Sequence, residues 1–248
     1  MAKRGKYNKD DPEAKAARDR VVTIIDSVPP EDLVMSIKRA PSLRGMILGY
    51  IAEEMFEKYV PAKYGFIASD DIEKHDDHNR QFNKSDRTIR NGGRLYRIQL
   101  KSVQTNSIKR NLETGLLQAD VQNDASDSRT IHLPTGNSII TTCYARGDYD
   151  ILAVPLFPFT GEWIYAYKRN IDCRSSTSEK YTAEDAQYLL ATTEIITWPL
   201  TDAWTMNLGD LLTDTIGLVA AKKTIDKIVE GDILDDAIGL VSKPAGKV

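Results

Sequence analysis

The stretch Ser85-Asp-Arg-Thr-Ile-Arg-Asn-Gly-Gly-Arg-Leu-Tyr-Arg-Ile-Gln-Leu-Lys-Ser102 predicts a β-hairpin, from which the rest of the fold is built outward. Asn91-Gly92 is a strong signal for a tight type I′ turn, because both central residues must tolerate positive φ. A two-residue loop at this point pairs Arg90 with Gly93 and places Asp86 opposite Arg97. A three-residue loop is the alternative, and it would need a β-bulge to restore the same register.

Alternation along the two strands gives the hairpin two different faces. One face is apolar and suited to packing on a core: Ile89, Tyr96, Ile98 and Leu100. The other face collects the polar residues: Asp86, Arg97, Gln99 and Lys101. A carboxylate, an amide oxygen and a lysine on adjacent strands can hold a hard divalent cation beside a nucleophilic water. An ordinary surface hairpin with a polar outer face is the alternative interpretation.

The charge distribution around this hairpin favours the functional interpretation. The whole chain is acidic, with a formal net charge of −3 at pH 7, yet Asp86 is the only acid between Arg80 and Arg110. A local basic patch is sufficient for binding phosphates, whatever the net charge of the protein. We therefore expect one basic surface on an acidic body and phosphodiester chemistry on nucleic acid. The residues expected to contact DNA are Arg87, Arg90, Arg94, Arg97, Lys109 and Arg110.

Composition places the chain among globular proteins. It has 248 residues, of which 41% are hydrophobic and 28% charged. The sequence contains no apolar run long enough to span a bilayer, and its polar start does not resemble a signal peptide. Cys143 and Cys173 are too few for a disulfide framework or a zinc site, so a reducing cytoplasmic location is expected.

The order of predicted elements gives the fold class. Helices are expected at 31–37, at 43–59 with Ser42 as its cap, and at 182–191. Further strands are expected at 130–133, 138–143, 150–157, 163–167 and 195–199. This order predicts an α/β (α+β) fold with a mixed central β-sheet flanked by helices. We expect an N-terminal arm with helices at 1–42, a core domain at 43–200, and a helical extension at 201–248 that packs on the core or at a dimer interface.

Several of these pieces together resemble the PD-(D/E)xK nuclease superfamily, which includes many type II restriction endonucleases. The matching pieces are Gly49-Tyr-Ile-Ala-Glu53 on the first core helix, Asp86 on the hairpin, and Gln99-Leu-Lys101 on the next strand. The strand pair at 149–157 and 163–167 is similar to the pair that often follows the active site in such enzymes. The resemblance covers about residues 43–168. It implies a restriction-endonuclease-like core.

The resemblance also implies a role for each matching residue. Asp86 would be the central Mg²⁺ ligand, and Gln99 and the carbonyl of Leu100 would complete the site. Lys101 would position the attacking water or stabilise charge on the phosphate. Glu53 would assist the metal from the helix, with Glu54 and Glu57 as rivals. The chain departs from the family pattern in having glutamine at position 99 and no proline before Asp86. A neutral amide is a weaker Mg²⁺ ligand than a carboxylate.

The function implied is a Mg²⁺-dependent endonuclease of double-stranded DNA, most simply a type II restriction enzyme. Such an enzyme reads a symmetric site as a homodimer and has a cognate DNA methyltransferase acting separately. Base contacts are expected from 103–129. The alternatives are a homing, repair or junction-resolving nuclease, a catalytically silent DNA-binding module, and an unrelated α/β domain whose basic hairpin binds an acidic protein.

Overall fold

The computed structural model describes residues 12–13, 15–16, 27–64, 72–74, 85–91 and 94–212. The chain divides into two compact units, Met1–Leu48 and Gly49–Val248, and each is described by itself. Most of the predicted N-terminal arm, and the predicted C-terminal extension beyond residue 212, lie outside the described residues. None of the described helices combines the length and the apolar composition required to cross a bilayer.

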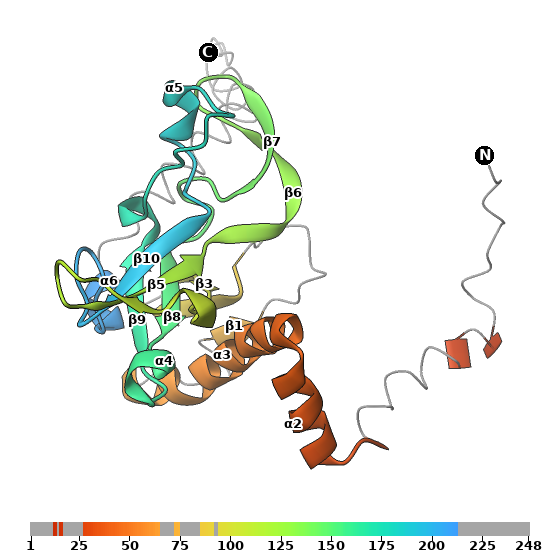
Figure 1. The fold of residues 1–248 in the computed structure, drawn as a ribbon. Coiled ribbons are helices and arrows are strands. Elements are labelled where there is room, and N and C mark those ends of the chain that lie inside the picture. The colour runs from red at the N-terminus through yellow and green to blue at the C-terminus, as the bar shows by residue number, and fades with distance from the viewer. Residues whose placement is uncertain are drawn as a thin grey trace, which may run out of the picture. The chain divides into compact units, whose positions relative to one another are not determined.

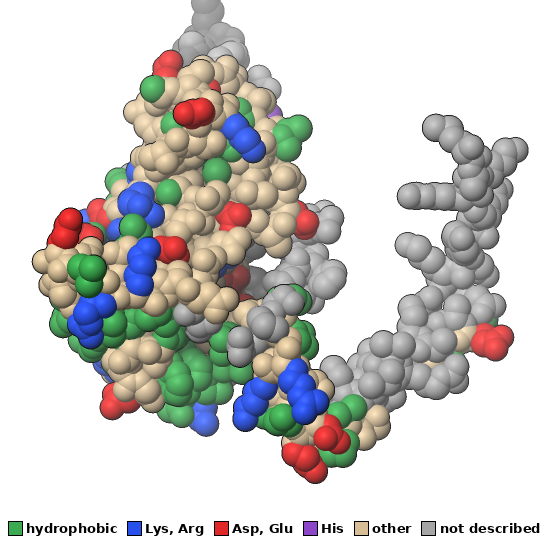
Figure 2. All heavy atoms as spheres, in the orientation of Figure 1, with side chains coloured by type: hydrophobic (Ala, Val, Ile, Leu, Met, Phe, Trp, Pro, Cys, Tyr) green, Lys and Arg blue, Asp and Glu red, His purple; other side chains and the backbone are tan. Residues whose placement is uncertain are grey.

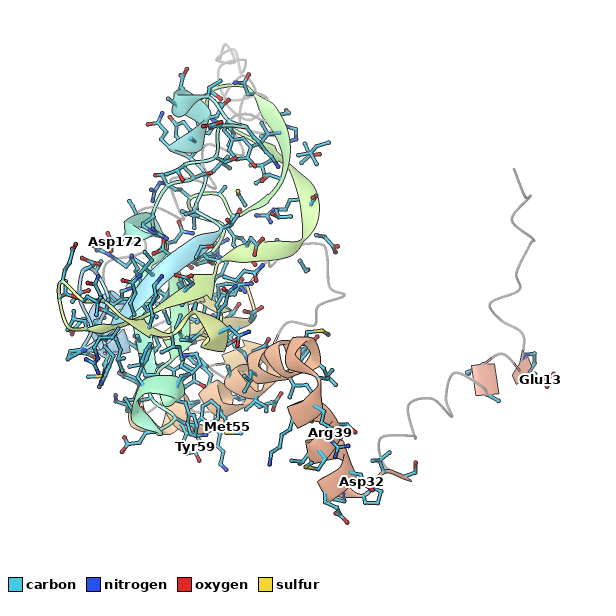
Figure 3. The ribbon with its side chains drawn as sticks, viewed as in Figure 1. Glu13, Asp32, Arg39, Met55, Tyr59 and Asp172 are labelled. Carbon is cyan, nitrogen blue, oxygen red and sulfur yellow. The ribbon has the colours of Figure 1, made fainter. Side chains whose placement is uncertain are left out.

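The first unit contains the helix α2 (Pro30–Arg39), which confirms the helix predicted at 31–37. Proline stands at its first position, where the missing N–H costs nothing. Glu31 and Asp32 lie in the first turn and Lys38 and Arg39 in the last, so both ends complement the helix dipole. Asp32 and Arg39 mark the two ends in Figure 3.

The helix α3 (Pro41–Tyr64) begins in the first unit and ends in the second. Ser42 lies inside this helix, so its predicted role as the N-cap is wrong. Ala52, Phe56 and Val60 are spaced one turn apart and are buried. Tyr59 is 43% exposed. Met55 and Tyr59 project from this part of α3 (Figure 3).

The helix α3 continues past its predicted end at Tyr59 and runs through Pro61. An internal proline removes a backbone hydrogen bond and normally ends a helix. Here the last turn is held by tertiary contacts: the Tyr64 hydroxyl accepts a hydrogen bond from the Leu208 N–H at 2.8 Å and donates one to the Met206 carbonyl at 3.1 Å. Leu208 belongs to the short helix α6 (Leu208–Leu211), which packs in the same core.

The central sheet has the strand order β1-β2-β3-β8-β9. Its strands are β1 (Ile72–Lys74), β2 (Arg87–Asn91), β3 (Arg94–Leu100), β8 (Ile151–Pro155) and β9 (Tyr165–Arg169). The β3–β8 pair is parallel and the other pairs are antiparallel. This mixed sheet confirms the predicted α+β fold class. Because β8 is an interior strand with a core on each face, all five of its residues are buried, as its continuous apolar run predicts.

The hairpin register differs from the predicted one by two residues. Thr88, rather than Asp86, lies opposite Arg97, and Ile89 lies opposite Tyr96. The predicted pairings of Asp86 with Arg97 and of Arg90 with Gly93 are therefore wrong. Side chains alternate with a period of two, so an even shift leaves every side chain on its predicted face. The consequence is that Asp86 moves next to Gln99.

A second sheet, with the order β10-β5-β4, covers the other face of the central sheet. Its strands are β4 (Lys109–Arg110), β5 (Leu117–Gln122) and β10 (Thr193–Trp198), of which only β10 was predicted. Ile151 and Ala153 of β8 pack in the core beneath α3, whereas Leu152 and Val154 pack in the core that includes β5. The central sheet thus carries the helix α3 on one face and the strands of the second sheet on the other.

A two-stranded ribbon, β6 (Asp124–His132) with β7 (Ser138–Cys143), extends from these sheets toward α5 (Ala183–Ala186), as Figure 1 shows. This pair confirms the strands predicted at 130–133 and 138–143, the first of which begins earlier, at Asp124. The turn of the ribbon is tied to α5: Thr135 Oγ1 and Asn137 Nδ2 donate hydrogen bonds to the Asp185 carboxylate at 2.7 and 3.0 Å. The helix predicted at 182–191 ends at Ala186, because Leu189 and Leu190 form β-bridges instead.

The Asp185→Asn variant is expected to lose less stability than the wild type at acid pH. The Thr135 hydroxyl, followed by Thr182 and Asn137, holds the pKa of the Asp185 carboxyl below its usual value of 3.8. The ionised carboxylate therefore stabilises the fold above the unfolded-state pKa, and this contribution is lost as the pH falls through the lower folded pKa. Urea unfolding from about pH 6 to about pH 2 measures the difference. Parallel curves for the two proteins would contradict the prediction.

Candidate active site

The candidate active site lies where β2 begins and β3 ends. Asp86 directly precedes β2, and its Oδ2 accepts a hydrogen bond from the Leu100 backbone N–H at 2.7 Å. The same oxygen accepts a hydrogen bond from Gln99 Nε2. Lys101 follows β3 directly. The structure therefore brings together Asp86, Gln99 and the Leu100 N–H, with Lys101 as the next residue along the chain. The predicted ligation of a metal by Asp86, Gln99 and the Leu100 carbonyl stays a prediction.

The Asp86 carboxylate is held in an environment that disfavours its charge. Burial raises its pKa above the usual value of 3.8. The positive charge of Lys101 and the hydrogen bonds from Leu100 and Gln99 act in the opposite direction without cancelling this effect. A cation bound at the carboxylate would favour its ionised form. A metal ion bound next to Asp86 would therefore stabilise the charged form of this carboxylate.

The amide of Gln99 presents an unused acceptor beside this carboxylate. Gln99 is 2% exposed, and its Oε1 has no hydrogen-bond partner among the described residues. Its Nε2 is already bound to Asp86. A buried acceptor without a partner costs about 1–3 kcal/mol, so its position calls for a physical reason. An oxygen ligand for a hard cation is one such reason.

Lys101 is positioned by two groups that sequence reasoning did not identify. Its Nζ donates a hydrogen bond to the Asp124 carbonyl at 2.9 Å and lies 5.5 Å from the centroid of the Tyr144 ring. The Arg129 guanidinium lies 5.1 Å from the same centroid. Tyr144 therefore has two cations near its ring, and cation–π contacts of this kind hold both in place.

Arg129 and Tyr144 are in turn fixed by their surroundings. Arg129 Nη2 forms an ion pair with Asp148 Oδ2, which also accepts a hydrogen bond from the Ala145 N–H at 2.6 Å. Burial, followed by the charge of Asp86, raises the pKa of the Tyr144 hydroxyl, so this group stays protonated at neutral pH. Arg129 lies in a polar stretch and Tyr144 just beyond β7, and no local motif distinguishes either residue.

Two glutamates of α3, Glu53 and Glu57, bind an arginine of the hairpin. The Arg87 side chain is fully buried, and its Nη1 donates hydrogen bonds to Glu53 Oε2 at 3.1 Å and to the Asp86 carbonyl at 2.8 Å. Its Nη2 reaches Glu57 Oε2 at 3.4 Å. The prediction that Arg87 contacts DNA is wrong for this conformation, because the guanidinium faces the core and pairs with α3. Glu54 is exposed.

The other predicted DNA-contacting residues that the structure describes lie on two different sheets. Arg90 is exposed on β2, but Arg97 donates from its backbone N–H to Asp150 Oδ2 at 2.7 Å and from Nη2 to the Gly147 carbonyl at 2.6 Å. Lys109 and Arg110 are exposed on β4, in the second sheet, and the Arg94 side chain lies outside the described residues. On the face shown in Figure 2, Lys and Arg side chains are interspersed with acidic ones.

Metal-ligating side chains are sparse at this site. Within the described ranges, no three His, Cys, Asp or Glu side chains are grouped in a way that would hold a metal ion. At the hairpin the donors are one carboxylate, from Asp86, and the Gln99 amide oxygen. Such a set fits Mg²⁺, which is usually held by one or two carboxylates together with substrate phosphates and water.

Comparisons with known proteins add a limited structural likeness. No protein-family model matches the chain, and no curated protein matches it. Among solved structures, that of a bacterial homing endonuclease, I-Ssp6803I, is similar over 57% of this chain and 85% of its own chain. The sequence identity is 15% and the TM-score is 0.30. A similarity of this size does not assign the chain to a family.

Proposed function

We propose that this protein is a Mg²⁺-dependent endonuclease that hydrolyses phosphodiester bonds of double-stranded DNA. The observation that carries the proposal is the contact of Asp86 with Gln99 and Leu100, directly before Lys101. A carboxylate, an unused amide oxygen and an ammonium group meet there at the ends of two paired strands. These groups suit a reaction in which negative charge develops on a phosphate.

The residues that would hold the ion are Asp86, through its carboxylate, and Gln99, through Oε1, with the Leu100 carbonyl as a third oxygen. Bound Mg²⁺ supplies positive charge near the phosphate and a water of lowered pKa. Because Asp86 is the single carboxylate in this set, we infer weak binding of the free ion and tighter binding when substrate phosphate contributes ligands.

The protein's own groups then act on the phosphate. Lys101 carries a fixed positive charge that can stabilise the negative charge developing on the phosphate oxygens. The Asp124 carbonyl and the Tyr144 ring hold this ammonium in place and limit its rotamers. Positioning of this kind lowers the barrier because the charge need not reorganise during the reaction.

Glu53 is given a positioning role in this proposal. Its carboxylate binds Arg87, and Arg87 binds the backbone carbonyl of Asp86, so α3 fixes the start of β2 through one guanidinium. Glu57 supports the same guanidinium at a longer distance of 3.4 Å. The direct metal contact predicted for Glu53 would require this carboxylate to be shared with Arg87.

One observation favours a second candidate function, a DNA-binding module without catalysis. The described site has a single carboxylate, that of Asp86. The family that the chain resembles usually has a second acid at the position of Gln99. Assignment as a type II restriction enzyme, the homodimer and the separate methyltransferase stay predictions. So do the homing, repair and junction-resolving alternatives.

The test is cleavage of a mixed pool of plasmid and linear duplex DNA, with Mg²⁺ or with EDTA. We expect discrete fragments with Mg²⁺ and intact DNA with EDTA. Sequencing of the fragment ends separates a short symmetric site from a long one, and a branched substrate in the pool tests junction cleavage. DNA binding without cleavage under any metal condition would favour the silent module.

A further inference from the structure

A groove beside β7 adjoins the candidate active site. Two neighbouring hollows of about 430 and 480 Å³ lie between β7 and residues 174–181, and both are lined by Thr142, Lys180 and Tyr181. We call them together the β7 groove. The contacts described above do not involve the β7 groove.

The lining of the β7 groove has the chemistry of an anion site. Two cations, Arg174 and Lys180, contribute to it, and no carboxylate of the described residues lines it. Arg174 Nε lies 3.8 Å from the buried Glu194 carboxylate, so the anion site depends mainly on the charge of Lys180. Glu179 belongs to the same segment but does not line either hollow. Most of the remaining lining side chains carry hydroxyl groups, among them those of Thr142, Ser175, Ser176 and Ser178.

Three of these hydroxyl groups each accept one hydrogen bond from within the protein. Ser175 Oγ accepts a hydrogen bond from Arg146 at 2.7 Å, Ser176 Oγ accepts from the Ser178 N–H at 3.3 Å, and Ser178 Oγ accepts from the Lys180 N–H at 3.4 Å. No described residue accepts a hydrogen bond from any of the three. Because each hydroxyl has one hydrogen to donate, these hydrogens remain available to a ligand oxygen.

Neighbouring residues link the lining of the groove to the site around Lys101. Cys143, which lines the groove, lies opposite Asp124 in the β6–β7 ribbon, and the Asp124 carbonyl binds Lys101 Nζ. The next residue, Tyr144, contacts the same ammonium through its ring. A chain of phosphates with one phosphate at Lys101 would therefore meet the groove lining within a short distance.

We infer that the β7 groove binds the sugar–phosphate backbone of DNA next to the phosphate that is cleaved. This inference rests on the proposed function and names a surface that holds the substrate. Phosphate contacts in protein–DNA complexes come mainly from Arg, Lys, Ser and Thr side chains and from backbone N–H groups. Such contacts set the register of the protein on the duplex and do not depend on sequence.

The test is DNA binding by fluorescence anisotropy in EDTA, so that no cleavage occurs. Lys180→Glu is expected to weaken binding about tenfold on duplexes of unrelated sequence, because a backbone contact is lost and a repulsion is added. Lys180→Ala is expected to make the slope of log K against log salt shallower by about 0.9, as for one phosphate contact. Lys58→Glu is the matched control, since Lys58 is an exposed lysine on α3, and it should bind as the wild type does.

Ser178→Ala separates hydroxyl donation from charge. It is expected to weaken binding about two- to tenfold, the value of one hydrogen bond, without changing the salt slope. Wild-type affinity in both Lys180 variants would overturn the inference. Binding of inorganic pyrophosphate that depends on Lys180, without any effect of Lys180 on duplex binding, would also overturn it and indicate a small phosphorylated ligand.

The outcomes also separate this inference from the proposed function. If the wild type does not bind duplex DNA at all, both are wrong. If duplex binding depends on Lys180 but Mg²⁺ produces no cleavage, the inference about the β7 groove is supported and the proposed catalysis is wrong. If Mg²⁺ produces cleavage that is the same in Lys180→Glu and the wild type at limiting DNA, the groove inference alone fails.

Discussion

Lys101→Met is expected to lower the rate of DNA cleavage about 100- to 1,000-fold at saturating enzyme, the usual cost of removing one charge-stabilising donor from an active site. Methionine keeps most of the aliphatic length of lysine and removes the ammonium group that lies near the Tyr144 ring. DNA affinity should change by no more than one phosphate contact would contribute. The measurement is single-turnover cleavage with Mg²⁺, with affinity determined separately in EDTA.

Lys58→Met provides the control for this prediction, because it makes the same substitution on an exposed face of α3. It should cleave at the wild-type rate. Thermal unfolding of both variants establishes that the fold is intact. Cleavage by Lys101→Met at the wild-type rate would remove this lysine from the chemistry, and the site would then have to be sought elsewhere.

The sequence predicted the central part of the fold because its signals there are local. The continuous apolar run at 150–157 indicated a strand buried on both faces, and β8 divides its side chains between the two cores. Alternation in the hairpin placed Asp86 and Gln99 on one face. They remained on one face despite an error of two residues in the register, because an even shift does not exchange the faces of a strand.

The strand β5 was missed although its signal is present. Leu117, Ala119 and Val121 alternate with polar residues, but the segment is short and surrounded by polar sequence. Its pairing with β10 joins segments far apart in the chain, and no local pattern encodes that partner. The contacts of Lys101 with Asp124 and Tyr144 depend on the same long-range packing.

For Arg87, the sequence predicted the correct face of the strand but the wrong role for the side chain. Alternation already places Arg87 on the face of Ile89, which packs in the core, yet the basic composition of the segment suggested a DNA contact. The partner that makes burial tolerable, Glu53, is 34 positions away on another element. Sequence pattern therefore predicted where the side chain points but not what neutralises it there.

Glu53→Gln is expected to lower the free energy of unfolding by about 3 kcal/mol, measured by urea denaturation in EDTA. The Arg87 side chain is fully buried, so loss of the carboxylate leaves a buried guanidinium whose remaining contacts are the Asp86 carbonyl and the longer ion pair with Glu57. Arg87→Met should cost less, because the Glu53 carboxylate that remains is 18% exposed and can be hydrated, while methionine fills the apolar space.

A double-mutant cycle identifies the cause of the Glu53 effect. In the Arg87→Met background, Glu53→Gln should change stability by no more than about 0.5 kcal/mol, because the buried charge it neutralised is gone. An equal loss in both backgrounds would contradict the pairing. If Glu53 instead serves only as a metal ligand, Glu53→Gln would leave stability in EDTA unchanged in either background and would weaken cleavage in a way that added Mg²⁺ restores. The positioning role requires the opposite pattern: a loss of stability without metal that depends on Arg87.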